Sequence, residues 1–439
     1  MHELLRQYGE EKMSAGETIL ARDHHSHYFA GFLHSSEDQL RAGAERKTLD
    51  EIIAEMDNVR AAWDWMVQHC QTQELKHSCT SLFRVYETRL HLQEGVRMFG
   101  LSVEAMRQAA PHPGNRLVLA TLLRLQGRLC GMLGDQELAK QLLSEALEIA
   151  REQGEKKEEA FALNNLGILA MMVGEYAQAK QYYQASLAIK RELGEPNAIA
   201  ITLVNLIQVA YLMGEYAQGT ALAHETIAYA QSLGRNGLVA SCKYFLGEIT
   251  RALGHTEQAR RWYEEALALY RDLMEHWAIA VCLDGLACVA IEQHDYDQAN
   301  HLAREGLECA QKIGYSGITA SCRNTLGRIA CAQGLYEKAQ HLHLQAIQSA
   351  WTTKQPSLVL DGLIGIATAR AKTGQANAAL ELLTFVIRHP ATIAWDKARA
   401  ARLLAEVETQ LAPEAITAAH ERGSALKLDQ ITKMILAHS

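Results

Sequence analysis

Three histidines near the N-terminus are the side chains whose spacing best suits a metal ion. His24, His25 and His27 form an H-H-x-H motif, and the first and last of them share one face of a helix. Two ligands on one face are a weak signal, because protein zinc sites use three or four ligands. We therefore interpret this segment as an exposed, partly amphipathic helix and expect no metal site.

The sequence contains none of the common motifs for catalysis or nucleotide binding. No GxxxxGK[ST] loop is present to cradle phosphates, and there is no HExxH motif and no serine-centred nucleophile elbow. Asp295 and Asp297 stand beside His294, where a turn between two helices explains them. The sequence therefore predicts a protein that is not an enzyme and that needs no cofactor.

The nine cysteines include no CxxC pair, and three of them are spaced by forty residues. Cys242, Cys282 and Cys322 occupy one position of a repeat, where other repeats place Ala162 or Thr202. A small buried side chain accounts for this pattern, so we expect free thiols in a reducing compartment. Because the N-terminus has no signal-peptide pattern either, we expect a cytoplasmic protein.

Residues at a constant spacing show which elements must position any functional side chain. The segment Gly174-Glu175-Tyr176-Ala177-Gln178-Ala179 recurs forty residues later as Gly214-Glu215-Tyr216-Ala217-Gln218-Gly219. The complete series at this step is Gly134, Gly174, Gly214, Gly254, His294, Gly334 and Gly374. A fixed step of this length indicates a repeat protein, in which each unit contacts mainly its neighbours.

Each repeat is predicted to form two helices, A and B, joined by a tight turn. In the second repeat, helix A is expected at residues 158–173 and helix B at residues 176–193. This pattern resembles the tetratricopeptide repeat, with Gly167 at the crossing of the two helices and Ala179 facing it. The predicted fold is all-α, a right-handed α-solenoid of tetratricopeptide-like helix pairs with a 40-residue period.

The N-terminal segment resembles the connector of a class of bacterial signal-transduction ATPases. His2-Glu3-Leu4-Leu5-Arg6-Gln7-Tyr8 resembles an H-x-L-L-R-x-Y helix, and Asp57-Asn58-Val59-Arg60-Ala61-Ala62 resembles a D-N-L-R-A-A motif, with Val59 in place of leucine. Both motifs are typical of the STAND class (signal-transduction ATPases with numerous domains), which includes regulators of the LuxR and AfsR type. In that class the first motif follows a winged helix and the second leads into helical repeats.

The resemblance implies that ATPase and effector domains lie elsewhere in a longer polypeptide. Met1 stands directly before the connector, which suggests a cut from such a protein, and a native start is the alternative. We expect a connector at residues 1–73, a degenerate first repeat at 74–115, seven repeats at 116–390 and a C-terminal helical cap at 391–439. Outside the repeats we expect helices at residues 2–9, 21–36, 49–68 and 395–410.

Charge and hydropathy exclude two classes of partner. The net charge is -8, with scattered lysines and arginines, which argues against direct binding of nucleic acid by this chain. No apolar run is expected to reach the roughly 20 residues that span a bilayer, so we predict no membrane partner.

The surfaces of the A helices are the predicted binding site, because they line the inner side of a curved stack. The repeat pattern places a mixture of arginines, aromatics and other polar side chains on this face, and such residues are enriched where binding energy concentrates. The candidates are Arg124, Arg128, Asn164, Gln208, Tyr211, Tyr244, Glu248, Arg251, Asp284, Asn324 and Arg328.

Two functions agree with this pattern. The first is a sensor module that binds an inducer, either a small molecule or a protein, and controls a STAND ATPase switch in transcriptional regulation. The second is a stand-alone scaffold that joins other proteins. The resemblance of the connector favours the first, and the sequence identifies neither the inducer nor the oligomeric state.

Overall fold

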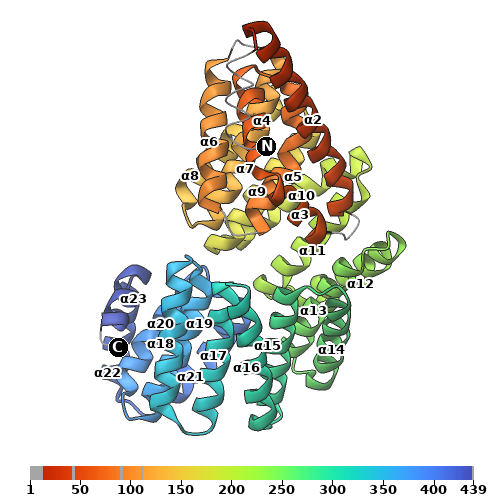
Figure 1. The fold of residues 1–439 in the computed structure, drawn as a ribbon. Helices are drawn as coiled ribbons and strands as arrows, with labels where there is room; N and C mark the ends of the chain where they lie inside the picture. The colour runs from red at the N-terminus through yellow and green to blue at the C-terminus, as the bar shows by residue number, and fades with distance from the viewer. Residues whose placement is uncertain (1–12, 42–44, 89–91, 110–111, 438–439) are drawn as a thin grey trace. The chain divides into compact units, whose positions relative to one another are not determined.

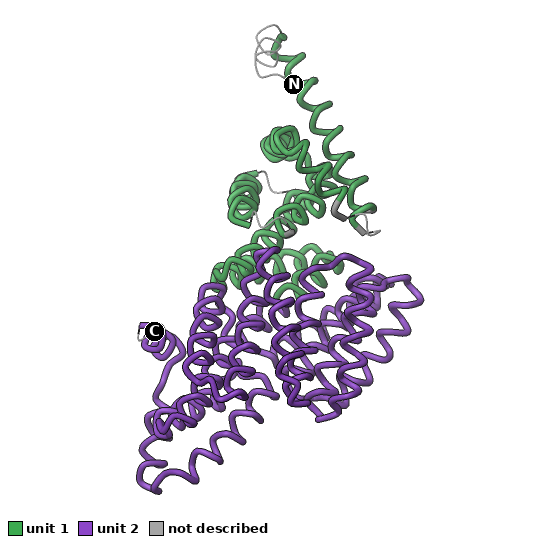
Figure 2. The backbone as a smooth tube through the Cα atoms, turned by 60° about the horizontal axis from the view of Figure 1, so that its bottom comes forward, with its two compact units in different colours: residues 1–166 green, residues 167–439 purple. Residues whose placement is uncertain are grey.

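The computed structural model describes residues 13–41, 45–88, 92–109 and 112–437, and throughout these residues the chain is helical (Figure 1). Helices α2 to α23 follow one another with no strand between them in the described part. The helix expected at residues 2–9 lies outside the described residues. The chain forms two compact units, residues 1–166 and 167–439, which are described separately below (Figure 2).

The first unit begins with helices that surround a small aromatic core. Trp63 is 1% exposed, its ring meets Phe99 edge-on, and its Nε1 donates to the Ser102 hydroxyl at 2.8 Å. The helices of this unit are α2 (Ala15–Arg41), α3 (Glu45–Ala54), α4 (Met56–Gln68), α5 (Thr72–Thr88), α6 (Leu92–Gln108), α7 (Pro113–Met132), α8 (Gln136–Glu152) and the first part of α9 (Lys156–Val173).

Two helix expectations near the N-terminus were wrong in their bounds. The helix expected at 21–36 begins at Ala15, because Ser14 and Glu17 form a capping box. The Ser14 backbone N–H donates to the Glu17 carboxylate at 2.8 Å, and the Glu17 backbone N–H donates to the Ser14 hydroxyl at 3.3 Å. The helix expected at 49–68 is two helices, because Glu55 has ψ 12° and leaves the helical conformation between α3 and α4.

The repeat prediction is confirmed by seven consecutive helix pairs. In the second repeat the helices span residues 156–173 and 176–193, within two residues of the expectation. The pairs after α7 and α8 are α9 with α10 (Tyr176–Leu193), α11 (Pro196–Met213) with α12 (Tyr216–Ser232), α13 (Asn236–Ala252) with α14 (Thr256–Asp272), α15 (His276–Glu292) with α16 (Tyr296–Lys312), α17 (Ser316–Ala332) with α18 (Tyr336–Thr352), and α19 (Pro356–Lys372) with α20 (Ala376–Arg388).

The turn between helices A and B has the same left-handed backbone in every repeat. Gly174 has φ 87°, a conformation that glycine adopts without a steric cost. His294 takes the glycine position in the fifth repeat and still has φ 62°, so the geometry of the turn persists where the residue type has changed.

Helices A and B cross at a position where, in six of the seven repeats, a small residue faces a larger one. A Cβ on Gly167 would lie 2.6 Å from the Tyr183 ring, so only glycine fits opposite that side chain. Where the partner in helix B is Ala223, the residue in helix A is Ile207 instead. The other matched pairs at this position are Gly127 with Leu143, Gly247 with Tyr263, Ala287 with Ala303, Gly327 with His343 and Ala367 with Leu383.

Contacts between successive repeats show which helices line the inner face of residues 167–439. Helix α11 contacts α13, α13 contacts α15, α15 contacts α17, and α17 contacts α19, whereas the described B helices α12, α14, α16 and α18 show no comparable contacts with one another. A stack whose A helices are closer together than its B helices curves toward the A helices. The A helices therefore form the concave side of this unit.

One helix contradicts the expectation that no apolar run is long enough for a bilayer. By length and composition, α11 could cross a membrane, with a mean hydropathy of 1.5 over 18 residues. It is also helix A of the third repeat, it packs against α10, α12 and α13, and half of it is buried. The apolar composition of α11 is therefore explained by its place in the core of the solenoid.

Three helices follow the last repeat, and they pack in two different ways. Helix α22 (Pro413–Ala425) lies on α20, where Arg422 pairs with Glu381 at 2.6 Å, and α23 (Leu428–Ala437) contacts α18. Helix α21 (Ala394–Glu408) instead turns back along the array and contacts both α19 and α11. The end of the chain therefore extends the core at the last repeat and also returns to the concave side.

Candidate ligand-binding groove

The inner groove of residues 167–439 is the space between α21 and the A helices α11, α13, α15, α17 and α19. The segment that leads into α21 is fixed at the start of this unit, because the Tyr176 hydroxyl donates to the Ala391 carbonyl at 2.9 Å. Gly174 lies so close to Ala391 that a Cβ on the glycine would overlap it. The groove is thus partly filled by a helix of the same chain.

A buried ion pair on α13 forms the first wall of the inner groove. Glu248 and Arg251 are three residues apart, so one helical face carries both, and they are 8% and 5% exposed. Arg251 bonds to Glu248 at 3.2 Å and to Glu292 of α15 at 3.3 Å. Burial opposes ionisation of Glu248, but the charge of Arg251 and the nearby hydroxyls of Tyr211 and Tyr263 hold its pKa below the usual value.

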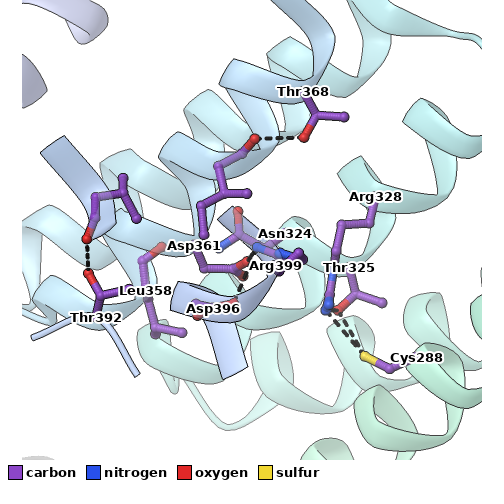
Figure 3. Close-up of polar contacts among 12 residues, drawn as sticks. Cys288, Asn324, Thr325, Arg328, Leu358, Asp361, Thr368, Thr392, Asp396 and Arg399 are labelled. Atoms are coloured by element: carbon purple, nitrogen blue, oxygen red, sulfur yellow. Dashed lines mark hydrogen bonds and ion pairs between the residues drawn. The ribbon is translucent and has the colours of Figure 1, made fainter. Parts of the chain in front are cut away.

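On α17, Arg328 has only neutral partners among the described residues. Its Nη2 donates to the Thr325 hydroxyl at 2.8 Å and lies 3.2 Å from the Cys288 sulfur (Figure 3). No carboxylate of the described residues lies within ion-pair distance of this guanidinium, although Asp284 and Asp361 are near enough to act on its charge. A partly buried guanidinium whose hydrogen-bond partners are all neutral can still take a charged acceptor, and it is therefore a candidate for binding a ligand.

The third arginine comes from α21 and does have acidic partners. Arg399 pairs with Asp361 of α19 and, at 3.3 Å, with Asp396 of its own helix (Figure 3). Burial, together with the Asp361 charge and against the attraction of Arg399, raises the pKa of Asp396 to about 6. Burial opposes ionisation of Asp361, but the charges of Arg399 and Arg328 lower its pKa to about 2.

A cavity of about 540 Å³ lies where these groups meet. Trp395 of α21 forms one side, with the Arg251 guanidinium 4.8 Å and the Arg402 guanidinium 5.8 Å from its ring centroid. The size is within the range of roughly 300–1,000 Å³ of small-molecule pockets. The residues that line it are Arg251, Ala252, Leu253, Gly254, Thr256, Cys288, Ile291, Glu292, Arg328, Trp395, Arg399 and Arg402.

Of the predicted binding residues in this unit, Arg251 and Arg328 line the cavity. Glu248 bonds to Arg251, and the Tyr211 hydroxyl in turn bonds to Glu248. Tyr244 is half-buried and its ring packs 5.9 Å from Tyr263.

The other predicted residues of this unit have different surroundings. Gln208 is half-buried on α11 and does not line the cavity. Asp284 is 8% exposed and accepts a hydrogen bond from Ser321 at 2.6 Å, and burial raises the pKa of this carboxyl. Asn324 is completely buried, where its amide donates to the Leu358 carbonyl at 3.1 Å. The proposal of Asn324 as a ligand contact is therefore corrected: its polar atoms join helices α17 and α19.

The three predicted residues in the first unit lie on helices α7 and α9. Arg124 pairs with Glu158 of α9, and Arg128 pairs with Glu87 of α5 at 2.6 Å. Asn164 is 8% exposed on α9. The two arginines thus have carboxylate partners within their own unit.

The side chains that α21 contributes were not among the predicted binding residues; they are Trp395, Asp396, Arg399 and Arg402. Trp395, Arg399 and Arg402 have the spacing i, i+4, i+7, which places them on one helical face and could have been noticed. Nothing in the sequence indicates that this face is turned toward the repeats, because the 40-residue period ends before it.

The arrangement suits binding and offers little for catalysis. The Cys288 thiol beside Arg328 is not activated, since burial raises its pKa. All nine cysteines are free, and no group of three or more metal-binding side chains occurs in the described part of the chain. His27, one of the three histidines considered for a metal, instead lies 2.9 Å from Glu74.

Comparisons with known proteins identify the repeats. The paired helices and the curved inner face define an α-solenoid. Residues 118–192 and 198–272 match one family described as tetratricopeptide repeat, and residues 319–350 match a second family with the same description. The chain therefore contains tetratricopeptide repeats. A comparison of the sequence with curated proteins finds no match.

Solved structures with a similar fold include several regulatory proteins. A Rap protein complexed with competence and sporulation factor has a TM-score of 0.56 and 13% identity, over 77% of this chain and 98% of that one. The apo quorum sensor NprR from B. thuringiensis has a TM-score of 0.53 and 14% identity, over 88% and 98%. A STAND protein with a tetratricopeptide repeat sensor from Pyrococcus horikoshii has a TM-score of 0.48 and 13% identity, over 88% of this chain and 54% of that one. At these identities the similarity shows the fold alone.

Proposed function

We propose that this chain is a non-catalytic sensor module that binds an inducer in the inner groove and controls a STAND-type ATPase switch from the cytoplasm. The observation that carries the proposal is the ligand-sized cavity in the inner groove, which is lined by a guanidinium that forms no ion pair with any described residue. Two proteins of similar fold agree with a sensing role, since one holds competence and sporulation factor and another is a quorum sensor.

The connector motif on α4 supports the second half of the proposal. Its apolar side is in the core of the first unit, where Val59 and Ala62 have no exposed surface. Its polar side is open to solvent, with Asp57 and Asn58 exposed. A motif with one side that packs against the neighbouring helices α2, α5 and α6 and one side open to solvent has the form expected of a connector.

A sensor acts on a switch only by binding one state of it better than the other. The inducer would therefore have to favour one arrangement of α21 and the A helices, since both form the cavity. Regulation of transcription would then follow from the effector domain of the longer protein, as the resemblance to LuxR- and AfsR-type regulators implies.

The test begins with the coding sequence upstream of Met1, where an in-frame P-loop and winged helix are expected. ATP hydrolysis by that longer polypeptide is then measured with and without a low-molecular-weight extract of the host cells. We expect hydrolysis to increase several-fold with the extract, and the increase to be lost in Arg251→Ala. An upstream region without a P-loop would contradict the proposal and favour the stand-alone scaffold.

A further inference from the structure

The polar atoms around the cavity in the inner groove point to one class of ligand. Four arginines line the cavity, namely Arg251, Arg328, Arg399 and Arg402. Glu292 is the one carboxylate among the lining residues, and it is bonded to Arg251. A lining with this excess of positively charged N–H donors is complementary to a ligand that presents negatively charged acceptors.

Of the four arginines that line the cavity, two form ion pairs with carboxylates of the described residues and two do not. Arg251 is bonded to Glu248 and Glu292, and Arg399 is bonded to Asp361 and Asp396. Arg328 and Arg402 have no carboxylate partner among the described residues. Two guanidinium groups of the lining therefore remain without an ion pair to a described residue and can take one from a ligand.

We propose that this cavity binds a small organic anion, a carboxylate or a phosphate ester, through Arg328 and Arg402. Guanidinium groups bind both kinds of anion with two parallel hydrogen bonds, and the bonds are strong because both partners are charged. Trp395 positions Arg402 through the contact with its ring. The apolar wall formed by Ala252, Leu253 and Ile291 suits the carbon skeleton of such a ligand.

The inference rests on the proposed function in one respect, namely that this cavity is the sensor site. It adds the chemical class of the inducer. It has a direct consequence for the size of the ligand. Helix α21 closes one side of the cavity, so a folded protein cannot reach Arg328 while α21 is in place. Of the two kinds of inducer considered above, the structure with α21 in the groove accommodates the small molecule.

The experiment measures binding of three probes to the full chain by isothermal titration calorimetry. The probes are phenyl phosphate, benzoate and, as an uncharged control, benzyl alcohol. We expect the wild type to bind at least one of the two anions and not the alcohol, and the preferred anion tells whether the site takes phosphate esters or carboxylates. Arg328→Gln is expected to weaken binding by about tenfold or more, as for loss of a charge-assisted hydrogen bond.

Two further variants keep the test decisive. Arg402→Gln changes an exposed side chain and therefore leaves the fold intact, yet it is expected to weaken anion binding severalfold. Arg304→Gln, an exposed arginine of α16 outside the cavity, is the matched control and should bind like the wild type. Thermal melting without ligand should show that Arg328→Gln and Arg402→Gln are both folded at the temperature of the binding measurement, so that weaker binding is not caused by unfolding.

The proposal is overturned if neither anion binds the wild type at millimolar concentration, or if Arg328→Gln and Arg402→Gln bind as tightly as Arg304→Gln. These results would leave the sensor function standing if the extract still stimulates ATP hydrolysis. Conversely, an anion that binds without any effect on ATP hydrolysis would support the proposed site and contradict its regulatory role.

Discussion

In the inner groove, a single arginine forms ion pairs with two buried carboxylates. Arg399 is shared by Asp361 and Asp396, and one guanidinium cannot fully neutralise two buried carboxylates. The pair therefore responds as a unit, with the pKa of Asp361 lowered to about 2 and that of Asp396 raised to about 6. A buried carboxyl group whose pKa lies above the usual range makes the free energy of unfolding depend on pH.

The sign of this dependence follows from the two pKa values of Asp396. Its pKa is about 6 in the folded chain and close to 3.8 in the unfolded chain, so the folded state holds the proton more tightly. The stabilisation is fully present below pH 3.8 and is lost as the pH rises through 6. The contribution of Asp361 to the free energy of unfolding changes only below pH 3.8. It therefore does not offset the contribution of Asp396 between pH 3.8 and 6.

We therefore expect Asp396→Asn to gain stability over the wild type as the pH rises from 4 to 7. The difference in the free energy of unfolding should grow by on the order of 2–3 kcal/mol, measured by urea denaturation at each pH. Asp272→Asn, an exposed aspartate at the end of α14, is the control and should show no such trend. A difference between Asp396→Asn and wild type that is constant with pH would contradict the assignment.

At the scale of the element, α21 determines whether the cavity exists. Its inward side carries Ala400 and Val407, which have no exposed surface, together with Trp395 and Arg399. Its outward side carries Ala398, which is exposed. The helix is therefore held both by apolar contacts and by the ion pair to α19.

This orientation predicts opposite results for two alanines that are two residues apart. Ala400→Glu would bury a charge without a partner, so we expect it to release α21 from the groove. Hydrogen–deuterium exchange of the α21 amides should then be at least about tenfold faster, while α13 to α16 remain protected. Ala398→Glu should exchange like the wild type. Equal exchange in the two variants would mean that the helix has another orientation.

The repeat elements were predictable, and the position of α21 was not. The 40-residue spacing of the turn glycines located helices A and B of each repeat, because local backbone geometry demands those residues. The bond between Tyr176 and Ala391 joins residues 215 apart in the sequence, and no periodic signal connects them. Arg251 and Arg328 could be chosen from the pattern of helix A, whereas Trp395 and Arg399 required knowledge of where the chain returns.

At the scale of the whole molecule, the proposed function assigns different tasks to the two compact units. Residues 167–439 contain the cavity, and residues 1–166 contain the connector motif on α4. Within the first unit, Trp63 and Met66 of α4 are buried and secure the helix, while Asp57 and Asn58 remain exposed. Changes on the exposed side of α4 should therefore affect signal transfer more than they affect the free energy of unfolding.

A double variant tests this separation. Asp57→Ala with Asn58→Ala should change the free energy of unfolding by only about 0.5 kcal/mol, because both side chains are exposed. In the longer polypeptide the same change should reduce the stimulation of ATP hydrolysis several-fold. Gln68→Ala, exposed at the other end of α4, should leave both quantities unchanged. Full stimulation in the double variant would remove the connector from the proposed mechanism.

The return of α21 to the start of its unit also concerns the order in which the protein is made. A ribosome completes α13, α15 and α17 well before it reaches residues 394–408, which supply the remaining wall of the cavity. A nascent chain, or one shortened by a nonsense mutation before α21, would display every repeat and yet lack this wall of the cavity. The ability to recognise the proposed ligand would thus be acquired only after all of the repeats have been synthesised.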